Sequence, residues 1–350
     1  MRIQLKGKGK LLFTFQFLSL LCAILIIMIG LVTAVAYTAV RQRVAYRTNL
    51  KFEELTNTHV RELVHSFEIY NNALYATRGL FASAKVDANT WDSFIRSQSA
   101  PERFVGMKAL AYAEVVPGGK INTYQQMLRN TQYKKISIHP QKKQGDYVVL
   151  TYHEDVSLGE PERLNALGFD LASDPIRNDA IKRAKSSNTM TATDLVSLAS
   201  NGRTGFVFLL PLTDRLAGHN SSEPFGYSIA AFDMEKFIDS TIGTELAEDK
   251  TSMQITDVTR GQNTTLYRKV IQNDQYAVAR DVTLQVADRT WKISFQAPSS
   301  SLVLPAERYA PKIILGLGTG LTIAICATVY ILRLRYRLFV LVAAKEESDS

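Results

Sequence analysis

The chain has 350 residues, 46% of them hydrophobic and 21% charged, and its 41 Lys and Arg residues against 33 Asp and Glu residues give a formal net charge of +8. The apolar fraction excludes a disordered or fibrous chain, and two cysteines exclude a disulfide framework and a four-cysteine zinc site. The net charge invites a nucleic-acid-binding interpretation, but charge is unevenly distributed, because none occurs in residues 11–40 or 313–332. These two uncharged runs indicate the class of protein.

Both uncharged runs have the length of membrane-spanning helices. A bilayer core needs about 20 apolar residues in a helix. Basic residues stay with cytoplasmic loops, and here they lie before the first run and after the second: Arg2, Lys6, Lys8, Lys10, Arg333, Arg335 and Arg337. Arg41, Arg43 and Arg47 oppose this rule at the first run, but long outer domains cross largely regardless of charge. We therefore predict a two-span protein of the plasma (cytoplasmic) membrane, in contact with lipid, with both termini inside and residues 41–312 outside.

Each span has an alternative interpretation. Ala34-Val35-Ala36 resembles a signal-peptide cleavage site. The apolar run before it is longer than the usual signal core of about 7–15 residues, which favours an uncleaved span. The second run could instead be a buried core helix, but the arginine cluster after it favours a span.

The charge of the outer domain argues against a nucleic-acid partner. Both cysteines, Cys22 and Cys326, lie in the predicted spans. The flanks 1–10 and 333–350 hold eight basic and three acidic residues, so the outer part keeps 33 basic against 30 acidic residues. A domain this close to neutral lacks the basic footprint of a nucleic-acid-binding protein.

The outer domain begins with a long predicted helix. Residues 41–81 contain no proline and one glycine, and Val60, Phe67, Leu74 and Phe81 recur every seven residues. This spacing predicts an apolar stripe on a stalk helix that continues from the first span. The stripe packs either against the rest of the domain or against a second copy in a homodimer, and the sequence leaves both open.

Shorter helices and strands follow the stalk. We predict a short helix capped by Asn89-Thr90, and then helices at 121–129, 175–185 and 234–242. We predict strands at 105–116, 135–139, 147–152, 190–196, 206–212, 227–232, 253–258, 265–270, 277–286 and 291–295. The order of elements predicts an α+β fold, with two small antiparallel-sheet subdomains on the stalk. The predicted parts are a basic tail at 1–10, spans at 11–40 and 313–332, a stalk at 41–82, a membrane-distal subdomain at 83–232, a membrane-proximal subdomain at 233–305 and a cytoplasmic connector at 333–350.

Motifs for catalysis and metal binding are missing. The chain has no P-loop and no G-x-S-x-G elbow, and its five histidines are scattered. His153-Glu154-Asp155 is interpreted as a solvated turn at a strand end. We therefore predict no enzyme activity, cofactor, catalytic residue or metal site. Gly316-x3-Gly320 lies inside a span and predicts helix pairing in the membrane.

Residues 167–184 read LGFDLASDPIRNDAIKRA. This run resembles the G-x-D-x-x-S-x-x-x-R-x-x-A-x-x-x-A signature of the CHASE domain, the extracytoplasmic sensory domain of cytokinin receptors and many bacterial receptors. Other segments agree with the family in order over about residues 75–245: an aromatic helix around Trp91 and Phe94, AYAEVV at 111–116, a Thr-rich strand at 189–193, Gly205-Phe206 leading to LPL at 210–212, and FGY at 225–227 leading to AFD at 231–233.

The resemblance implies two PAS-like subdomains behind the stalk, with a small-ligand pocket in the membrane-distal one. In cytokinin-binding members the aspartate of G-x-D hydrogen-bonds the adenine ring, and Asp170 holds that position here. The same carboxylate can instead cap the following helix. The resemblance also places further residues near the pocket: Tyr112, Leu150, Thr193, Gly205 and Phe206. Ser186-Ser187-Asn188 departs from the family's Thr-Gly or Ser-Gly step, which weakens the case for a cytokinin specificity.

The resulting hypothesis is a membrane receptor that binds a small molecule or peptide, with a cytokinin- or purine-like ligand implied by the resemblance alone. Family outputs are histidine kinases and cyclases, which would lie on a missing segment or on a cytoplasmic partner. The alternative is a membrane-anchored interaction or assembly protein with ligand-free PAS-like folds. An enclosed pocket around Asp170 favours the receptor, and a filled core there favours the alternative.

Overall fold

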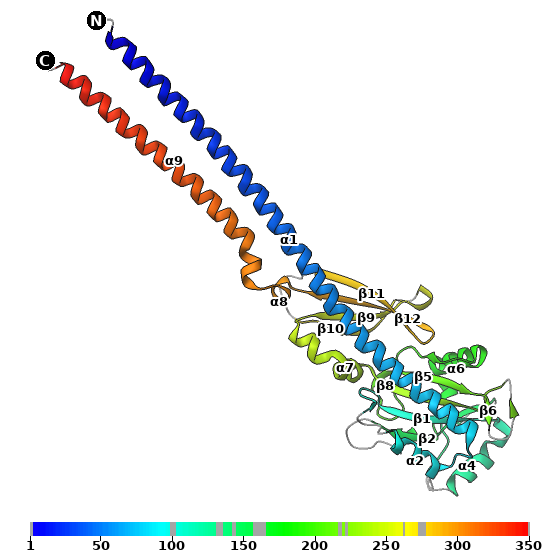
Figure 1. Cartoon of the computed structure of the whole chain (residues 1–350). Coiled ribbons are helices and arrows are strands. Elements are labelled where there is room, and N and C mark those ends of the chain that lie inside the picture. Colours follow the sequence, from blue (N-terminus) through cyan, green and yellow to red (C-terminus); the bar gives the residue numbers. More distant parts are fainter. Residues whose placement is uncertain are drawn as a thin grey trace. The chain divides into compact units, whose positions relative to one another are not determined.

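A computed structural model describes residues 3–98, 103–130, 136–141, 145–156, 166–215, 219–220, 223–261, 263–271 and 278–348 (Figure 1). The chain divides into two compact units. One unit combines residues 1–52 with 299–350, and the other is Glu53–Pro298.

The unit that combines the two ends of the chain is helical. Helix α1 (Ile3–Ser83) and helix α9 (Pro305–Ser348) are both long and apolar enough to cross a membrane, by length and composition. Within this unit a Cβ on Gly318 would lie 2.3 Å from the Thr33 side chain, so the glycine permits close helix approach. A Cβ on Gly316 or Gly320 would meet no other described atom within 4 Å, so their predicted pairing stays a prediction for contact with another chain.

The unit Glu53–Pro298 contains two larger antiparallel sheets. The first sheet has the order β2-β1-β8-β5-β3, with β4 pairing to β5, and the second has the order β10-β9-β12-β11 (Figure 1). The strands of the first sheet are β1 (Ala109–Val116), β2 (Tyr147–Asp155), β3 (Thr191–Ala192), β4 (Val196–Ser197), β5 (Thr204–Leu212) and β8 (Gly226–Asp233). Those of the second are β9 (Ser252–Asp257), β10 (Thr264–Lys269), β11 (Val278–Val286) and β12 (Arg289–Ala297), and β6 (Asp214–Arg215) pairs with β7 (His219–Asn220).

Short helices connect and cover the strands. They are α2 (Ala88–Ser97), α4 (Ile121–Arg129), α6 (Pro175–Ser187) and α7 (Met234–Glu248), with 3-10 turns η1 (Gly118–Lys120), η2 (Leu171–Ser173) and η3 (Thr259–Gly261). The short helix α8 (Ser299–Leu302) belongs to the other unit. The mixed helical and antiparallel character agrees with the predicted α+β class. The predicted strand at 135–139 is wrong where it is described, because only His139 forms an isolated bridge, to Phe169.

Aspartate caps fix where the helices begin. Asp174 accepts the Arg177 amide at 2.9 Å, so α6 starts at Pro175 as the sequence predicted. Asp87 accepts the Thr90 amide at 2.8 Å, so α2 starts at Ala88 and the predicted Asn89-Thr90 cap is wrong. An aspartate with extended backbone is as good a cap as asparagine, and here it lies earlier in the chain.

The apolar stripe of the stalk packs inside its own unit. Leu74 is fully buried, and the Phe67 ring lies 5.8 Å from Phe208 of the first sheet and 5.7 Å from Trp291 of the second. One stripe of α1 therefore joins the two sheets through an aromatic core. Of the two roles the sequence left open, this stripe has the internal one, and homodimerisation stays a prediction.

A buried histidine lies on the stalk. His59 of α1 is 2% exposed, its Nε2 is 3.4 Å from Oδ2 of Asp249, and its ring centroid is 6.1 Å from that of Phe295. Burial lowers the pKa of His59 below 6.5, although Asp249 and Glu245 act to raise it. The folded protein therefore favours the neutral ring, and stability is lost as the pH falls below the ordinary histidine pKa of about 6.5, where the unfolded chain takes up the proton.

We expect a thermal-unfolding scan of the full chain to show this loss between pH 7.5 and 5.5. His59→Gln removes the titrating group and should make the fall in Tm over this range smaller. His65→Gln is the matched control, because His65 is exposed on the same helix. Equal pH dependence in wild type and His59→Gln would contradict the assignment.

Candidate functional site

A cavity of about 680 Å³ opens beside strands β1 and β2 of the first sheet. We call it the aromatic cavity. Its walls come from the end of α1, the start of α2, β1, α4, β2 and the segment before β8. They are Phe81, Ala84, Lys85, Val86, Asp87, Ala88, Tyr112, Glu114, Tyr124, Met127, Leu128, Thr151, Tyr152 and Phe225. Ligand pockets for small molecules have volumes of about 300–1,000 Å³ and mostly apolar walls with few polar groups.

Strand geometry places two of these lining residues on the same face of the sheet. Side chains two residues apart on a strand point to the same face, so Tyr112 and Glu114 of β1 share one. Tyr112 pairs with Tyr152 across to β2, and Glu114 pairs with Gly226 on β8. A Cβ on Gly226 would lie 2.5 Å from the Tyr112 ring, so only glycine leaves room for that ring.

Five aromatic residues contribute to the walls of the cavity. Phe81 stacks on Tyr112 at 4.2 Å between centroids, and Tyr112 stacks on Tyr152 at 5.8 Å. Phe225 lies 6.1 Å from Phe81. Rings stacked in this way form a rigid apolar wall against which a small apolar guest can pack.

A small number of polar groups accompany the rings. The Tyr112 hydroxyl donates to the carboxylate of Glu114, and the hydroxyls of Tyr124 and Thr151 are 2.8 Å apart. Hydrogen bonds from Thr90 lower the pKa of Asp87, which keeps this capping carboxylate ionised beside the cavity. The Glu114 carboxylate is a hydrogen-bond acceptor in the wall of the cavity.

Of the predicted ligand residues, Tyr112 lines the aromatic cavity. Asp170 does not, because it lies fully buried before α6, where its Oδ1 accepts the amides of Val148 at 2.9 Å and Ala172 at 3.1 Å. This is the capping role that the sequence left open, and the core is filled at this carboxylate. A ligand contact at Asp170 stays a prediction.

The remaining predicted residues also lie away from this cavity. Leu150 packs in the core beneath α6, and Thr193 accepts the Val207 amide through Oγ1 at 2.9 Å. Phe206 stacks on Phe232 at 4.8 Å, in the aromatic core. A Cβ on Gly205 would lie 2.0 Å from the Phe232 carbonyl oxygen, so this glycine permits close strand approach. Their roles as ligand contacts stay predictions.

The sequence interpretation missed Glu114 as a candidate. It is the single charged residue of β1, ALAYAEVV, and it follows Tyr112 at the spacing of one strand face. A lone carboxylate within an otherwise apolar strand was the available signal. Phe81 and Phe225 carried no such signal, because distant segments bring them to the cavity.

The trio His153-Glu154-Asp155 is not a solvated turn. It forms the end of β2, where His153 is buried and Asp155 pairs with Lys108 at 2.5 Å. Both members of this ion pair are nearly enclosed, with side-chain exposures of 2% and 7%. Across the described ranges, no three His, Cys, Asp or Glu side chains gather closely enough to hold a metal ion.

Solved structures resemble the chain at low identity. An extracellular ligand-binding receptor from Desulfohalobium retbaense aligns over 71% of this chain and 40% of its own length, at 10% identity and a TM-score of 0.46. The ligand-binding domain of the Pseudomonas aeruginosa amino acid chemoreceptor PctC, in complex with GABA, aligns over 72% of this chain and 99% of its own, at 12% identity and a TM-score of 0.38. That of the Pseudomonas fluorescens chemoreceptor CtaA, in complex with L-isoleucine, aligns over 76% and 96%, at 13% identity and a TM-score of 0.38.

No curated protein matches the chain. A sequence family does: residues 84–267, which run from the end of the stalk through the first sheet and into β10, match the CHASE domain. The match contains the aromatic cavity apart from Phe81, and it contains the α6 signature. More than half of the sequence lies within it. The chain belongs to the CHASE domain family.

Proposed function

We propose that this chain is a membrane-bound sensor whose outer domain binds a small molecule in the aromatic cavity and transmits the binding event to the cytoplasm. In this proposal the two sheets are PAS-like folds, α1 and α9 are the spans, both termini are cytoplasmic, and a histidine kinase or a cyclase receives the signal. The observation that carries the proposal is the aromatic cavity of about 680 Å³ within the CHASE match.

The walls of the cavity specify a class of ligand. Its rings favour a flat or aromatic body, and the Glu114 carboxylate favours a partner with N–H donors or a protonated amine. Aromatic amines and adenine-type bases both present this chemistry. An aromatic carboxylate of the same size meets the like charges of Glu114 and Asp87, against the cation Lys85, and should bind more weakly than an amine.

The alternative of a ligand-free assembly protein draws support from the filled core at Asp170. The aromatic cavity argues against it, because its volume and mostly apolar walls are those of a small-molecule site. A cavity with stacked rings and an acceptor is the arrangement that small-molecule sites use.

Binding can move the output only by its difference in affinity for two conformations. A ligand that contacts β1, β2 and the last turn of α1 at the same time stabilises the conformation in which all three elements lie close enough to touch it. The last turn of α1 contributes Phe81 to the cavity, so the ligand acts directly on the stalk helix.

The test is a thermal-unfolding screen of the full chain in lipid nanodiscs. We expect tyramine, phenylethylamine, adenine or isopentenyladenine to raise Tm, and benzoate to raise it less. A ligand at 100 times its Kd adds about 2.7 kcal/mol of stability, which raises Tm by roughly 5–10 °C in a domain of this size. No shift with any amine or base, or an equal shift with benzoate, would contradict the proposal.

A further inference from the structure

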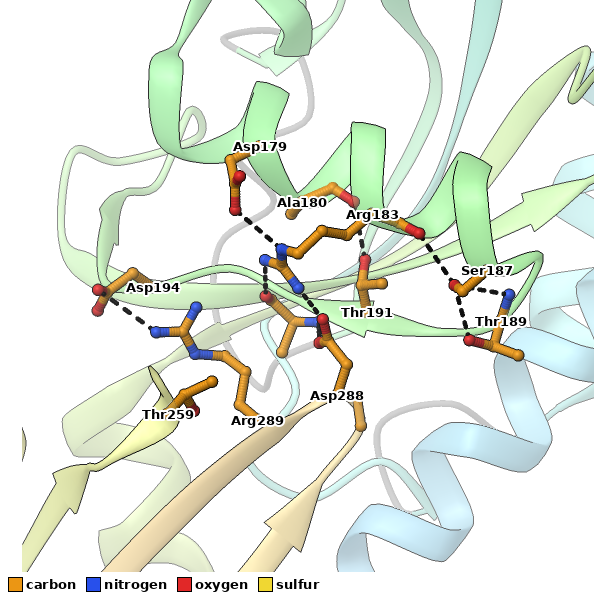
Figure 2. A network of polar contacts seen from close by, with 12 residues as sticks. Asp179, Ala180, Arg183, Ser187, Thr189, Thr191, Asp194, Thr259, Asp288 and Arg289 are labelled. Atoms are coloured by element: carbon orange, nitrogen blue, oxygen red, sulfur yellow. Dashed lines mark hydrogen bonds and ion pairs between the residues drawn. The ribbon is translucent and has the colours of Figure 1, made fainter. Parts of the chain in front are cut away.

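Ion pairs join the first sheet's helix α6 to the β11–β12 hairpin of the second sheet (Figure 2). Arg183 of α6 bonds to Asp179 at 2.8 Å, to the Ala192 carbonyl at 2.8 Å and to Asp288 in the hairpin turn. Asp288 in turn accepts the Ala192 amide at 2.9 Å. One carboxylate therefore binds both a helix and a strand segment of the other subdomain.

A second arginine continues the same network. Arg289, the first residue of β12, pairs with Asp194 of the first sheet's β3–β4 segment at 3.4 Å and with Asp257 at the end of β9. Figure 2 shows Arg183 between the carboxylates of Asp179 and Asp288, and Arg289 bonded to the carboxylate of Asp194. We call the pairs Arg183–Asp288 and Arg289–Asp194 the α6 clasp. The arginine side chains are only 15% and 9% exposed, so salt screens these pairs less than surface pairs.

The hairpin that carries the clasp also binds the stalk. Arg280 of β11 donates through Nη1 to the Glu53 carbonyl and the Asn57 side chain of α1, each at 2.9 Å, and to the Thr56 hydroxyl at 2.6 Å. Strands β11 and β12 pair without interruption from Val278–Ala297 to Val286–Arg289. At about 3.4 Å per residue, β11 separates Arg280 from Val286, the last residue before the turn, by roughly 20 Å.

Helix α6 lies on the opposite face of β1 and β2 from the aromatic cavity. Its residues Ala180, Ile181 and Ala184 pack in one core with Ala113 of β1 and Leu150 of β2. Tyr112 and Glu114 flank Ala113 in the chain, and Thr151 follows Leu150, yet these three line the cavity. A displacement of these strands therefore acts on α6 directly.

We propose that the β11–β12 hairpin transmits displacements of α6 to the stalk helix α1. The α6 clasp connects the hairpin to α6, and Arg280 connects it to α1. The coupling is a property of the fold and does not require that the ligand of the proposed function be known. Under the proposed function, it provides a route from the cavity to α1 that is additional to the direct contact through Phe81.

The test loosens α6 and follows the hairpin by hydrogen exchange of the full chain in nanodiscs. Ala180→Gly in the helix interior should raise amide exchange in α6 by about fivefold. With the clasp intact, we expect exchange in residues 284–291 to rise at least threefold as well. In an Asp288→Asn background, which keeps an acceptor but removes the charge, the hairpin response to Ala180→Gly should become smaller, because only the Arg289–Asp194 pair of the clasp remains.

Two further backgrounds separate coupling from simple destabilisation. Asp288→Glu keeps the charge and should restore the response. Asp281→Asn removes the Lys292–Asp281 pair, which lies within the same hairpin at 2.7 Å, and should leave the response intact. The proposed coupling is contradicted if amide exchange in the hairpin does not rise with Ala180→Gly, or if it rises equally in the Asp288→Asn background. Because no ligand is added, either result leaves the proposed function standing.

Discussion

Glu114→Gln is expected to weaken binding of an aromatic amine to the full chain by about 30-fold or more. Removing one partner of a charge pair that the ligand desolvates costs about 2–5 kcal/mol, and 1.4 kcal/mol corresponds to a tenfold change in Kd. Glutamine keeps the shape and still accepts the Tyr112 hydroxyl, so the cavity itself should persist. Titration calorimetry of tyramine in nanodiscs measures the effect.

Glu248→Gln is the matched control, because Glu248 is an exposed glutamate of α7 and does not line the cavity. Its Kd should equal that of the wild type. Benzoate should gain affinity in Glu114→Gln relative to the wild type, since the like charge is gone. A Kd for tyramine within threefold of wild type in Glu114→Gln would show that this carboxylate does not bind the ligand.

Asp155→Ala is expected to lower the free energy of unfolding by about 3–5 kcal/mol, because it leaves the enclosed Lys108 ammonium without the carboxylate bonded to it at 2.5 Å. Since 1 kcal/mol shifts Tm by about 2–4 °C in a domain of 150–250 residues, Tm should fall by roughly 10 °C. Thermal unfolding of the full chain measures it.

The exposed pair Lys292–Asp281 provides the comparison, with side-chain exposures of 43% and 56%. Asp281→Ala should cost less than about 1 kcal/mol, because exposed pairs contribute little. Replacing both members of the enclosed pair, as in Lys108→Met with Asp155→Leu, should recover much of the loss. If Asp155→Ala lowers the free energy of unfolding no more than Asp281→Ala does, the Lys108–Asp155 pair does not stabilise this end of β1 and β2.

Local signals predicted the elements well. Helix α4 has its predicted bounds, Ile121–Arg129, because the turn Pro117-Gly118-Gly119 ends β1 directly before it. Helix α6 starts at Pro175 because a capping aspartate and a first-turn proline both favour that residue. Such signals depend on neighbours in the chain, so one sequence suffices to read them.

The site was less predictable, because residues far apart in the chain form it. Phe81, Glu114 and Phe225 meet at one cavity through the order of strands in the sheet, which a single sequence does not encode locally. The resemblance placed two residues near a ligand: Tyr112, which lines the cavity, and Asp170, whose carboxylate caps a turn. The polar trio at the end of β2 was misinterpreted because the partner of Asp155, Lys108, lies in a distant segment, directly before β1.

The most direct test of ligand binding in the aromatic cavity uses the fluorescence of a tryptophan that lies beside it. The chain has two tryptophans, and Trp91 is buried and stacked on Tyr152 at 5.6 Å. Trp291→Phe leaves Trp91 as the single tryptophan reporter in the full chain. If the ligand binds in the aromatic cavity, tyramine should change the Trp91 emission saturably, with the Kd found by calorimetry, and Glu114→Gln should remove the change. Calorimetric binding without any change in Trp91 emission would place the ligand elsewhere and contradict the account.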